Sequence, residues 1–135
     1  MCWYSTTKNK LIAEEDISVY KIVRKLQNNI CDSIDRFYKY NKGEEYVNPI
    51  CFEENILSGY TVHSAFHSYK YLSMIRVCRY GYQVFTPNHT WRIDSIPFPC
   101  HIAKFIIPKG SIYYENIYGE IISDKIIFKD YVLGY

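Results

Sequence analysis

The last third of the chain consists of short apolar segments separated by tight turns. The segment from His101 to Ile107 is followed by Pro108-Lys109-Gly110-Ser111, where proline sets one φ angle and glycine accepts a φ angle that other residues avoid. Short β-branched and aromatic segments joined by such turns predict neighbouring β-strands. The same pattern continues in residues 112–114 and 125–132. A turn at 116–120, which contains Gly119, lies between these two segments.

The choice of apolar residues also favours sheets. The chain contains 19 Ile and 15 Tyr, but only 5 Leu and 3 Ala. Helix surfaces favour Ala and Leu, whereas pleated surfaces favour β-branched and aromatic residues. Ile and Tyr are also encoded by AT-rich codons, so base composition is an alternative source of the tyrosine excess. The isoleucines predict a sheet-dominated domain under either explanation.

Residues 16–25 alternate with the period of a strand. Val19, Lys21 and Val23 share one face, while Tyr20 and Ile22 lie on the other. Further candidate strands are residues 34–40 and 59–67, and a turn is expected at 41–44.

One helix is expected, from Tyr69 to Arg79. Ser68 is a suitable N-cap, Leu72, Ile75 and Arg79 follow helical spacing, and Gly81 is a plausible stop. The sequence therefore predicts an α+β fold, with a mainly antiparallel sheet of about five to seven strands and one principal helix. The chain is expected to form a single compact domain over residues 1–135, with residues 1–15 as an irregular N-terminal arm.

Several classes of protein are disfavoured. The chain has no run of about 18 apolar residues and no visible secretory signal, so we expect no membrane contact and a cytoplasmic location. The five cysteines are widely spaced without a CxxC pair, which disfavours a zinc ribbon or a disulfide framework. His63 and His67 lack the HExxH pattern, and Cys100 and His101 would face opposite sides of a strand. We therefore assign no metal, cofactor or catalytic residue.

Two segments have the chemistry of an anion site. If Ser68 caps a helix, the first-turn amides face an anion, Lys70 adds charge, and Tyr69 can stack on a planar group beside His67. The second segment is the turn with Lys109 and Ser111, followed by Tyr113 and Tyr114, one of which must face away from the core. Each segment also has an ordinary structural interpretation, as a capped helix and as a β-turn. The net charge of +2 is too small to indicate specific nucleic-acid binding, although residues 69–109 are biased towards basic side chains.

Three segments occur in the order found in one group of small proteins. They are Val19-Tyr20-Lys21-Ile22-Val23, then Phe66-His67-Ser68-Tyr69-Lys70, and finally residues 106–126 with the motifs IPKGSIYY and GEIISDKI. With these motifs the chain resembles small proteins of gut Bacteroidales and their phages, and departs from them at Ala65, where the group usually has Gly. The resemblance implies a phage-related origin and a bacterial host cell, and brings no established activity.

A second resemblance is to the ADP-ribosyltransferase-like fold. Those proteins place a basic residue on an early strand, a Ser or Tyr motif on a middle strand and a Glu near the final strands. The same order is found here for Lys21 or Arg24, the segment Phe66-His67-Ser68-Tyr69 and Glu120, although no Glu or Gln lies two residues before Glu120. Together with the two anion segments, this makes the following candidate ligand-binding residues: Lys21, His67, Ser68, Tyr69, Lys70, Lys109, Ser111, Tyr113 and Tyr114.

Three functions remain open. The first is a small binding protein that sequesters a nucleotide-derived or phosphorylated molecule, for example a sponge for a host immune signal in anti-defence. The second is a protein–protein inhibitor or structural interaction module, because exposed tyrosines are favoured at interfaces. The third is an active or degenerate ADP-ribosyltransferase-like enzyme. The absence of a catalytic signature favours a protein that is not an enzyme, with a small molecule or a host protein as partner and a homo-oligomer as a possible state.

Overall fold

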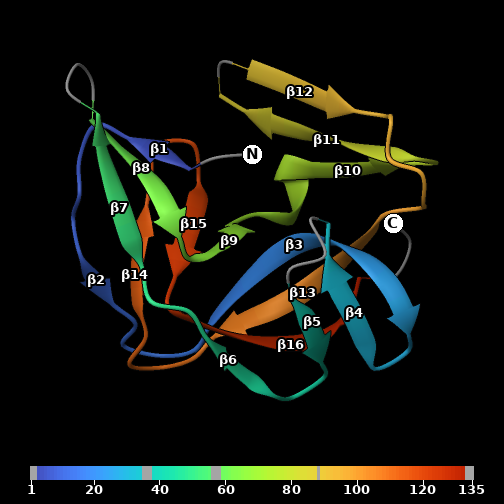
Figure 1. The fold of residues 1–135 in the computed structure, drawn as a ribbon, viewed down its shortest axis with the longest axis horizontal. Helices are drawn as coiled ribbons and strands as arrows, with labels where there is room; N and C mark the ends of the chain where they lie inside the picture. The colour runs from blue at the N-terminus through green and yellow to red at the C-terminus, as the bar shows by residue number, and fades with distance from the viewer. Residues whose placement is uncertain (1–2, 35–37, 56–58, 88, 133–135) are drawn as a thin grey trace.

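The computed structural model describes residues 3–34, 38–55, 59–87 and 89–132. These residues form strands β1 to β16 and one short 3-10 turn, η1 (Leu72–Met74), and they contain no α-helix (Figure 1). The fold is nearly all β, so the predicted α+β class with one principal helix is wrong, and the strands outnumber those predicted. No helix in the described ranges is long and apolar enough to cross a membrane.

The largest sheet, which we call the main sheet, contains ten strands. Its order is β2-β14-β15-β9-β3-β13-β16-β6, and β4 and β5 extend from β3 as a branch. All the pairings within it are antiparallel. Its strands are β2 (Leu11–Ile12), β3 (Ile17–Gln27), β4 (Ile30–Ser33), β5 (Lys39–Asn41), β6 (Glu45–Val47), β9 (Phe66–Tyr69), β13 (His101–Ile107), β14 (Ile112–Glu115), β15 (Glu120–Ser123) and β16 (Lys125–Tyr131).

Two three-stranded sheets flank the main sheet (Figure 1). The N-terminal sheet has the order β1-β8-β7, and the hairpin sheet has the order β10-β11-β12. Their strands are β1 (Tyr4–Ser5), β7 (Cys51–Asn55), β8 (Gly59–Ser64), β10 (Ile75–Cys78), β11 (Gly81–Thr86) and β12 (His89–Ile93). Residues 3–15, expected as an irregular arm, therefore contain the short strands β1 and β2, and Trp3 beside β1 is buried.

The expected helix at Tyr69–Arg79 is replaced by the end of β9, η1 and strand β10. Ser68 lies inside β9 and caps no helix. Ile75 pairs with Val84 and Cys78 pairs with Gly81, so β10 and β11 form a tight hairpin. Tyr, Ile, Val and Cys have weak helix propensity, and burial of Ile75 against β11 outweighs the helical spacing of a few apolar residues.

Strand β3 confirms the alternation expected from the sequence, and both of its faces are buried. Val19 and Val23 lie in a first core with Phe105 and Phe128. Ile22, on the opposite face, lies in a second core that also contains residues of the hairpin sheet. The central strand of the main sheet is therefore covered on both sides from Val19 to Val23, which fixes the core that each side chain of this part faces.

The other expected strands are only partly correct. Residues 34–40 do not form one strand, since β4 ends at Ser33 and β5 begins at Lys39, and residues 35–37 lie outside the described residues. The segment 59–67 is divided between β8 and β9 at Ala65. The turns at 41–44, 108–111 and 116–120 are present, with Gly43, Gly110 and Gly119 at positive φ.

Candidate functional site

The candidate site lies where the central strand β3 changes its partner. One edge of β3 is paired with β13 without interruption from Ile17 to Val23. On the other edge, β9 meets β3 at Tyr20, whereas β4 meets β3 only from Val23 onwards. Lys21 and Ile22 therefore lie at a junction between two strands.

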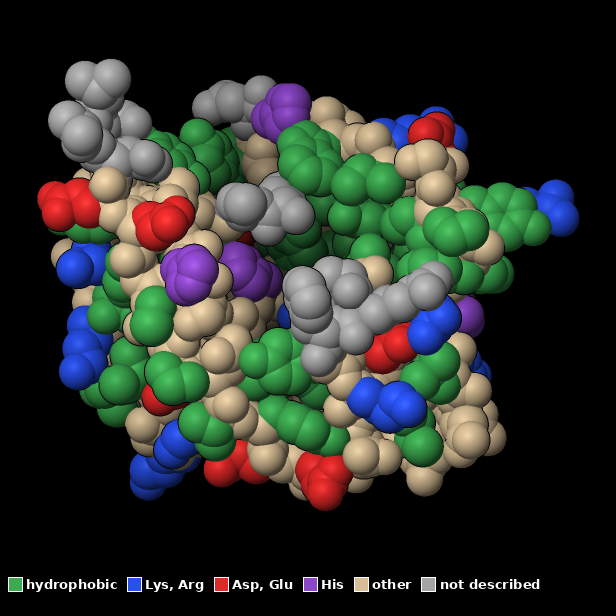
Figure 2. Space-filling view, viewed as in Figure 1, with side chains coloured by type: hydrophobic (Ala, Val, Ile, Leu, Met, Phe, Trp, Pro, Cys, Tyr) green, Lys and Arg blue, Asp and Glu red, His purple; other side chains and the backbone are tan. Residues whose placement is uncertain are grey.

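A pocket of about 320 Å³ opens at this junction, and we call it the central pocket. Figure 2 shows this face of the molecule hollowed near its centre, with histidine side chains on one side of the hollow. Its volume lies at the lower end of the range typical of ligand pockets. The pocket is lined by Lys21, Ile22, Ser33, Ile34, Tyr38, Tyr40, Ala65, Phe66, His67, Tyr69 and Tyr82.

Lys21 and His67 supply the basic side chains of the central pocket. The Lys21 Nζ donates a hydrogen bond to the backbone oxygen of His67, which ties β3 to β9. The same Nζ lies 6.0 Å from the centre of the Phe105 ring. These contacts hold a normally cationic group at the wall of an aromatic pocket.

Aromatic rings from separate elements form much of the pocket wall. Tyr38 and Tyr40 are nearly parallel, with ring centres 6.0 Å apart, and the edge of Phe66 meets Tyr38 at 5.2 Å. Ser33 fixes this wall, because its Oγ accepts a hydrogen bond from the Tyr38 amide at 3.2 Å and its amide donates to the Tyr38 oxygen at 2.9 Å. Tyr40 and Phe66 are buried, each with 1% of its surface exposed, so Tyr38 is the ring of this wall that a planar ligand could contact.

Tyr69 and Tyr82 come from two different sheets and both line the central pocket. Burial raises the pKa of both hydroxyl groups, and each of them adds to the second core. A phenol with a raised pKa stays protonated at neutral pH and remains a hydrogen-bond donor. The main sheet and the hairpin sheet therefore each contribute one tyrosine hydroxyl donor to the central pocket.

The charge of the pocket wall is positive in the described residues, since its lining includes Lys21 and no Asp or Glu among them. The neighbouring carboxylate, Asp32, is bound by Arg24 through two hydrogen bonds of 3.0 and 2.5 Å. A bidentate pair of this kind compensates the charge of Asp32 locally. An anionic ligand in the pocket would therefore meet the ammonium group of Lys21.

Only some residues of the first anion segment line the central pocket. Lys21, His67 and Tyr69 meet at the central pocket, as a shared site requires. Ser68 is buried with 3% of its surface exposed, and its Oγ makes no hydrogen bond within the described residues. Lys70 forms an ion pair with Glu115 at 2.9 Å, and this bond raises its pKa. The helix-cap amide site is absent because β9 continues through Ser68.

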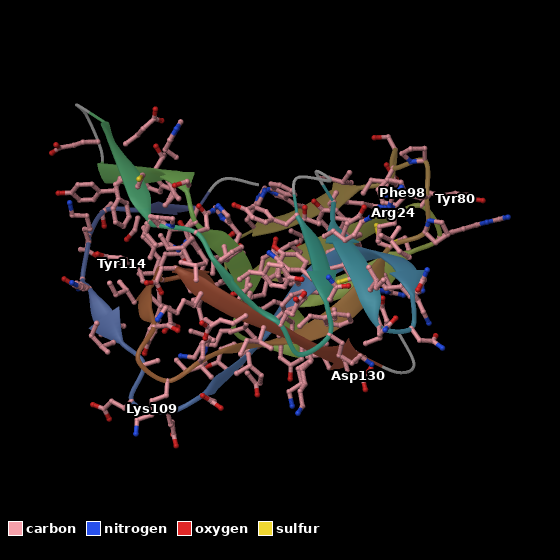
Figure 3. All side chains as sticks on the ribbon, turned by 60° about the horizontal axis from the view of Figure 1, so that its bottom comes forward. Arg24, Tyr80, Phe98, Lys109, Tyr114 and Asp130 are labelled. Atoms are coloured by element: carbon pink, nitrogen blue, oxygen red, sulfur yellow. The ribbon has the colours of Figure 1, made fainter. Side chains whose placement is uncertain are left out.

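The second anion segment lies away from the central pocket. Lys109 projects from the turn at one end of the molecule, far from Arg24 at the other end (Figure 3). Ser111 is fully buried and bonds the Pro108 oxygen, so its hydroxyl closes the turn. Tyr113 packs against the first core, and Tyr114 packs against Phe52 at 4.8 Å. This segment is explained by its structural role.

Glu120, the residue suggested by the transferase resemblance, is buried in a separate small cavity. Its carboxylate accepts a hydrogen bond from Asn116 at 2.8 Å, and burial raises its pKa. The cavity beside it has a volume of about 20 Å³ and is also lined by Trp3 and Ser68. A space of this size holds about one water molecule, far less than a nucleotide needs.

We find neither a metal site nor a catalytic thiol site in residues 3–34, 38–55, 59–87 and 89–132. No group of three metal-ligating side chains occurs there. Cys31, Cys51, Cys78 and Cys100 are free thiols, and burial raises the pKa of Cys31 to about 12 and of Cys100 to about 11. Buried thiols with raised pKa are poor nucleophiles at neutral pH.

The residues that sequence reasoning missed are Ser33, Tyr38, Tyr40 and Tyr82. The tyrosine excess was a general signal for them, but it could not separate these three tyrosines from the others. Tyr38 and Tyr40 become pocket residues because β5 folds back on β4, and Tyr82 because the hairpin sheet packs on the main sheet.

A scan against protein-family models, a search of the curated proteins and a search of the solved structures each found no match for this chain. The chemistry of the central pocket is therefore the basis for assigning a function.

Proposed function

We propose that this protein binds a nucleotide-derived or phosphorylated small molecule in the central pocket and sequesters it without chemical change. The observation that carries the proposal is the position of Lys21, which brings a cationic group to a pocket walled by Tyr38, Tyr40 and Phe66. A cation beside aromatic rings complements a ligand that has both an anionic and a planar part.

The setting of this function is a bacterial host cell, in keeping with the resemblance to proteins of gut Bacteroidales and their phages. A phage protein that removes a nucleotide signal from solution would blunt a host immune response. Such a sponge needs a tight pocket and no catalytic group. The polar groups of the central pocket include donors suited to binding, and burial raises the pKa of the Cys31 and Cys100 thiols, which makes these two thiols poor nucleophiles.

The test is a binding measurement on the purified protein and on Lys21→Gln. The probes are 5′-AMP, a cyclic dinucleotide and ADP-ribose, and each bound probe is recovered by denaturation and weighed by mass spectrometry. We expect at least one probe to bind and return unchanged. Lys21→Gln should weaken that binding about tenfold or more, since a charged hydrogen bond contributes about 1.5–3 kcal/mol.

The matched control is Lys109→Gln, which removes the same charge at the far turn and should leave the affinity unchanged. Circular dichroism melting of both variants shows whether each one folds. Absence of binding by every probe, equal weakening by the two variants, or recovery of a cleaved probe would reject the proposal.

A protein–protein inhibitor is the second candidate, and an exposed apolar patch favours it. Ile117 is 85% exposed at the tip of its turn, and Tyr71 and Phe85 are exposed beside the same groove. Aromatic and aliphatic side chains of this kind are frequent at protein interfaces. Loss of host-protein binding by Ile117→Asp, with small-molecule binding intact, would support this function for the patch.

The enzyme candidate has less support. Transfer of ADP-ribose needs a carboxylate that can reach a bound nucleotide, whereas Glu120 is 8% exposed and bonded to Asn116. Consumption of NAD that is lost in Glu120→Gln would restore this candidate.

A further inference from the structure

The free edge of the hairpin sheet is a surface separate from the central pocket, and the inference drawn from it does not depend on a ligand in that pocket. β12 lies at the outer side of this sheet and pairs only with β11 in the described residues (Figure 1). The N–H and C=O groups along the free side of an edge strand form a template for a further strand. β12 has five residues, and Thr90, Trp91 and Ile93 among them favour strand conformation.

The other edges of the described sheets are less open to a further strand. β1 and β2 have two residues each, and β5 and β6 have three each. β10 has four residues and contacts β13 of the main sheet. β7 has five residues, but it carries Glu53 and Glu54. Because short or charged strands protect an edge from pairing, β12 is the described edge most open to a partner, above all to an acidic one.

One face of the hairpin sheet carries a row of side chains that ends at this edge, which we call the basic row. Arg76 on β10 pairs with Gln83 on β11, and Gln83 pairs with Arg92 on β12, so the three side chains lie next to one another on one face. Both arginines are exposed, and residues 71–93 contain no Asp or Glu. Asp94 pairs with Arg92 at 3.1 Å, with both side chains more than half exposed. An exposed ion pair contributes little energy, so a carboxylate on a partner can compete for Arg92.

The basic row defines the chemistry of a strand added beside β12. The residue directly opposite Arg92 continues the row, and opposite charges across two strands attract whereas like charges repel. Its neighbours on the added strand face Trp91 and Ile93, which are half-buried and lie on the other face of β12. A matching strand therefore alternates apolar and acidic residues. A second copy of β12 matches less well, because it brings another Arg92 to the same face.

We propose that the β12 edge binds an extended segment of a partner protein, which adds a strand to the hairpin sheet and places an acidic side chain opposite Arg92. The apolar side chains of that segment lie against Trp91 and Ile93. In this mode of recognition, main-chain hydrogen bonds provide affinity and alternate side chains provide specificity.

The experiment uses the full chain and two end-capped peptides, TVEVT and TVKVT, which differ only in the charge of the central residue. The fluorescence of Trp91 reports binding, since Trp3, the other tryptophan, is buried. Hydrogen exchange identifies the strand that becomes protected. We expect TVEVT to bind about threefold to tenfold more tightly than TVKVT and to slow exchange in β12. Equal binding of the two peptides, protection of another edge instead, or no protection of β12 at millimolar TVEVT overturns the proposal.

Arg92→Glu reverses the charge at the edge and should reverse the preference, so that this variant binds TVKVT more tightly. Arg92→Gln should bind the two peptides equally. The matched control is Lys129→Glu, because Lys129 is exposed on β16 of the main sheet and its variant should keep the preference for TVEVT. Circular dichroism melting checks that each variant folds. A preference for TVEVT that persists in Arg92→Glu and Arg92→Gln rejects the role of Arg92.

Two measurements distinguish other occupants of this edge. Sedimentation velocity and hydrogen exchange of the protein alone should show no dimer through β12, and a dimer that protects β12 amides overturns the proposal in favour of a second copy. Single-stranded oligothymidylate should not displace TVEVT. Displacement would assign the basic row to phosphate groups and would also overturn the proposal.

Discussion

Lys21 illustrates how one residue can serve both the fold and the site. Its position in β3 follows from strand alternation, and its Nζ bonds the His67 oxygen on the neighbouring strand β9. A lysine normally keeps its ammonium in water, and here it reaches the wall of an aromatic pocket. The residue therefore carries charge to the junction where β3 changes partner.

Gly81 and Gly110 are needed for different physical reasons. Substitution by alanine should therefore lower the free energy of unfolding by different amounts at the two positions. A Cβ at Gly81 would lie 1.8 Å from the Ile93 oxygen, whereas Gly110 has φ +89 and open space around it. Gly110→Ala should cost about 1–2 kcal/mol through backbone strain alone. Gly81→Ala should cost more than about 3 kcal/mol, because the backbone of β12 must move.

Urea unfolding of both variants measures this difference in the free energy of unfolding. Gly43→Ala is the matched control for Gly110→Ala, since Gly43 also has positive φ and open space. A Gly81→Ala variant as stable as Gly110→Ala would contradict the close approach of β11 and β12.

At the scale of elements, the turn between β14 and β15 is organised around buried polar groups. Asn116 accepts hydrogen bonds from the amides of Tyr118 and Glu120, and its Nδ2 donates to the Tyr4 oxygen. Trp3 donates to the Glu120 oxygen at 3.0 Å. The first strand is therefore held to the last third of the chain by this turn.

The burial of Glu120 in this turn makes stability depend on pH. Burial raises its pKa in the folded protein above the ordinary value of 4.5. The folded state therefore keeps a proton that the unfolded state releases, and the free energy of unfolding falls as pH rises from about 4.5 through the raised pKa. Glu120→Gln should remove this fall. The free energy of unfolding of Glu120→Gln, relative to that of the wild type, should therefore be greater at pH 7 than at pH 4.

Urea titrations between pH 4 and 8 test this sign. Glu54→Gln serves as the control, because Glu54 is exposed on β7 and should leave the pH profile unchanged. A wild-type profile that stays parallel to that of Glu120→Gln would contradict the buried, ionisable role of this carboxyl group.

The hairpin of β10 and β11 shows why one element was predicted wrongly. Leu72, Ile75 and Arg79 follow helical spacing, and Ile75 and Val77 also follow the alternation of a strand. Local sequence cannot choose between two such patterns over so few residues. Pairing with β11 decides it, because Ile75 and Val84 become buried together.

At the scale of the whole molecule, the main sheet and the hairpin sheet share two cores that meet along β3, and the N-terminal sheet packs on a separate cluster around Trp3 and Ile122. The first core lies on one face of this strand, and the second core joins its other face to the hairpin sheet. The central pocket opens where these two cores approach each other at the strand junction. Ligand contacts with Tyr69 and Tyr82 would bridge the two sheets.

This arrangement predicts a gradient of hydrogen exchange. β13 is paired on both edges, and Ile102, Phe105 and Ile107 are fully buried. β12 pairs only with β11 in the described residues and is largely exposed. Mass spectrometry should find β13 amides the slowest to exchange and β12 amides among the fastest, and a ligand bound in the central pocket should slow exchange in β9 and β11. Equal protection of β12 and β13 would contradict this order.

The sequence alone determined the turns and the strands that depend on local chemistry. Gly110 and Gly119 mark turns because the φ angle of a residue is a local property, and residues 101–107 form the predicted strand β13 with the same bounds. The tertiary structure decided what non-local pairing controls: that β10 forms a hairpin, that Ser68 and Glu120 are buried, and that Lys21, Tyr38, Tyr69 and Tyr82 meet at one pocket. Strand partners are chosen by burial and register between segments far apart in the chain, and no local pattern encodes that choice.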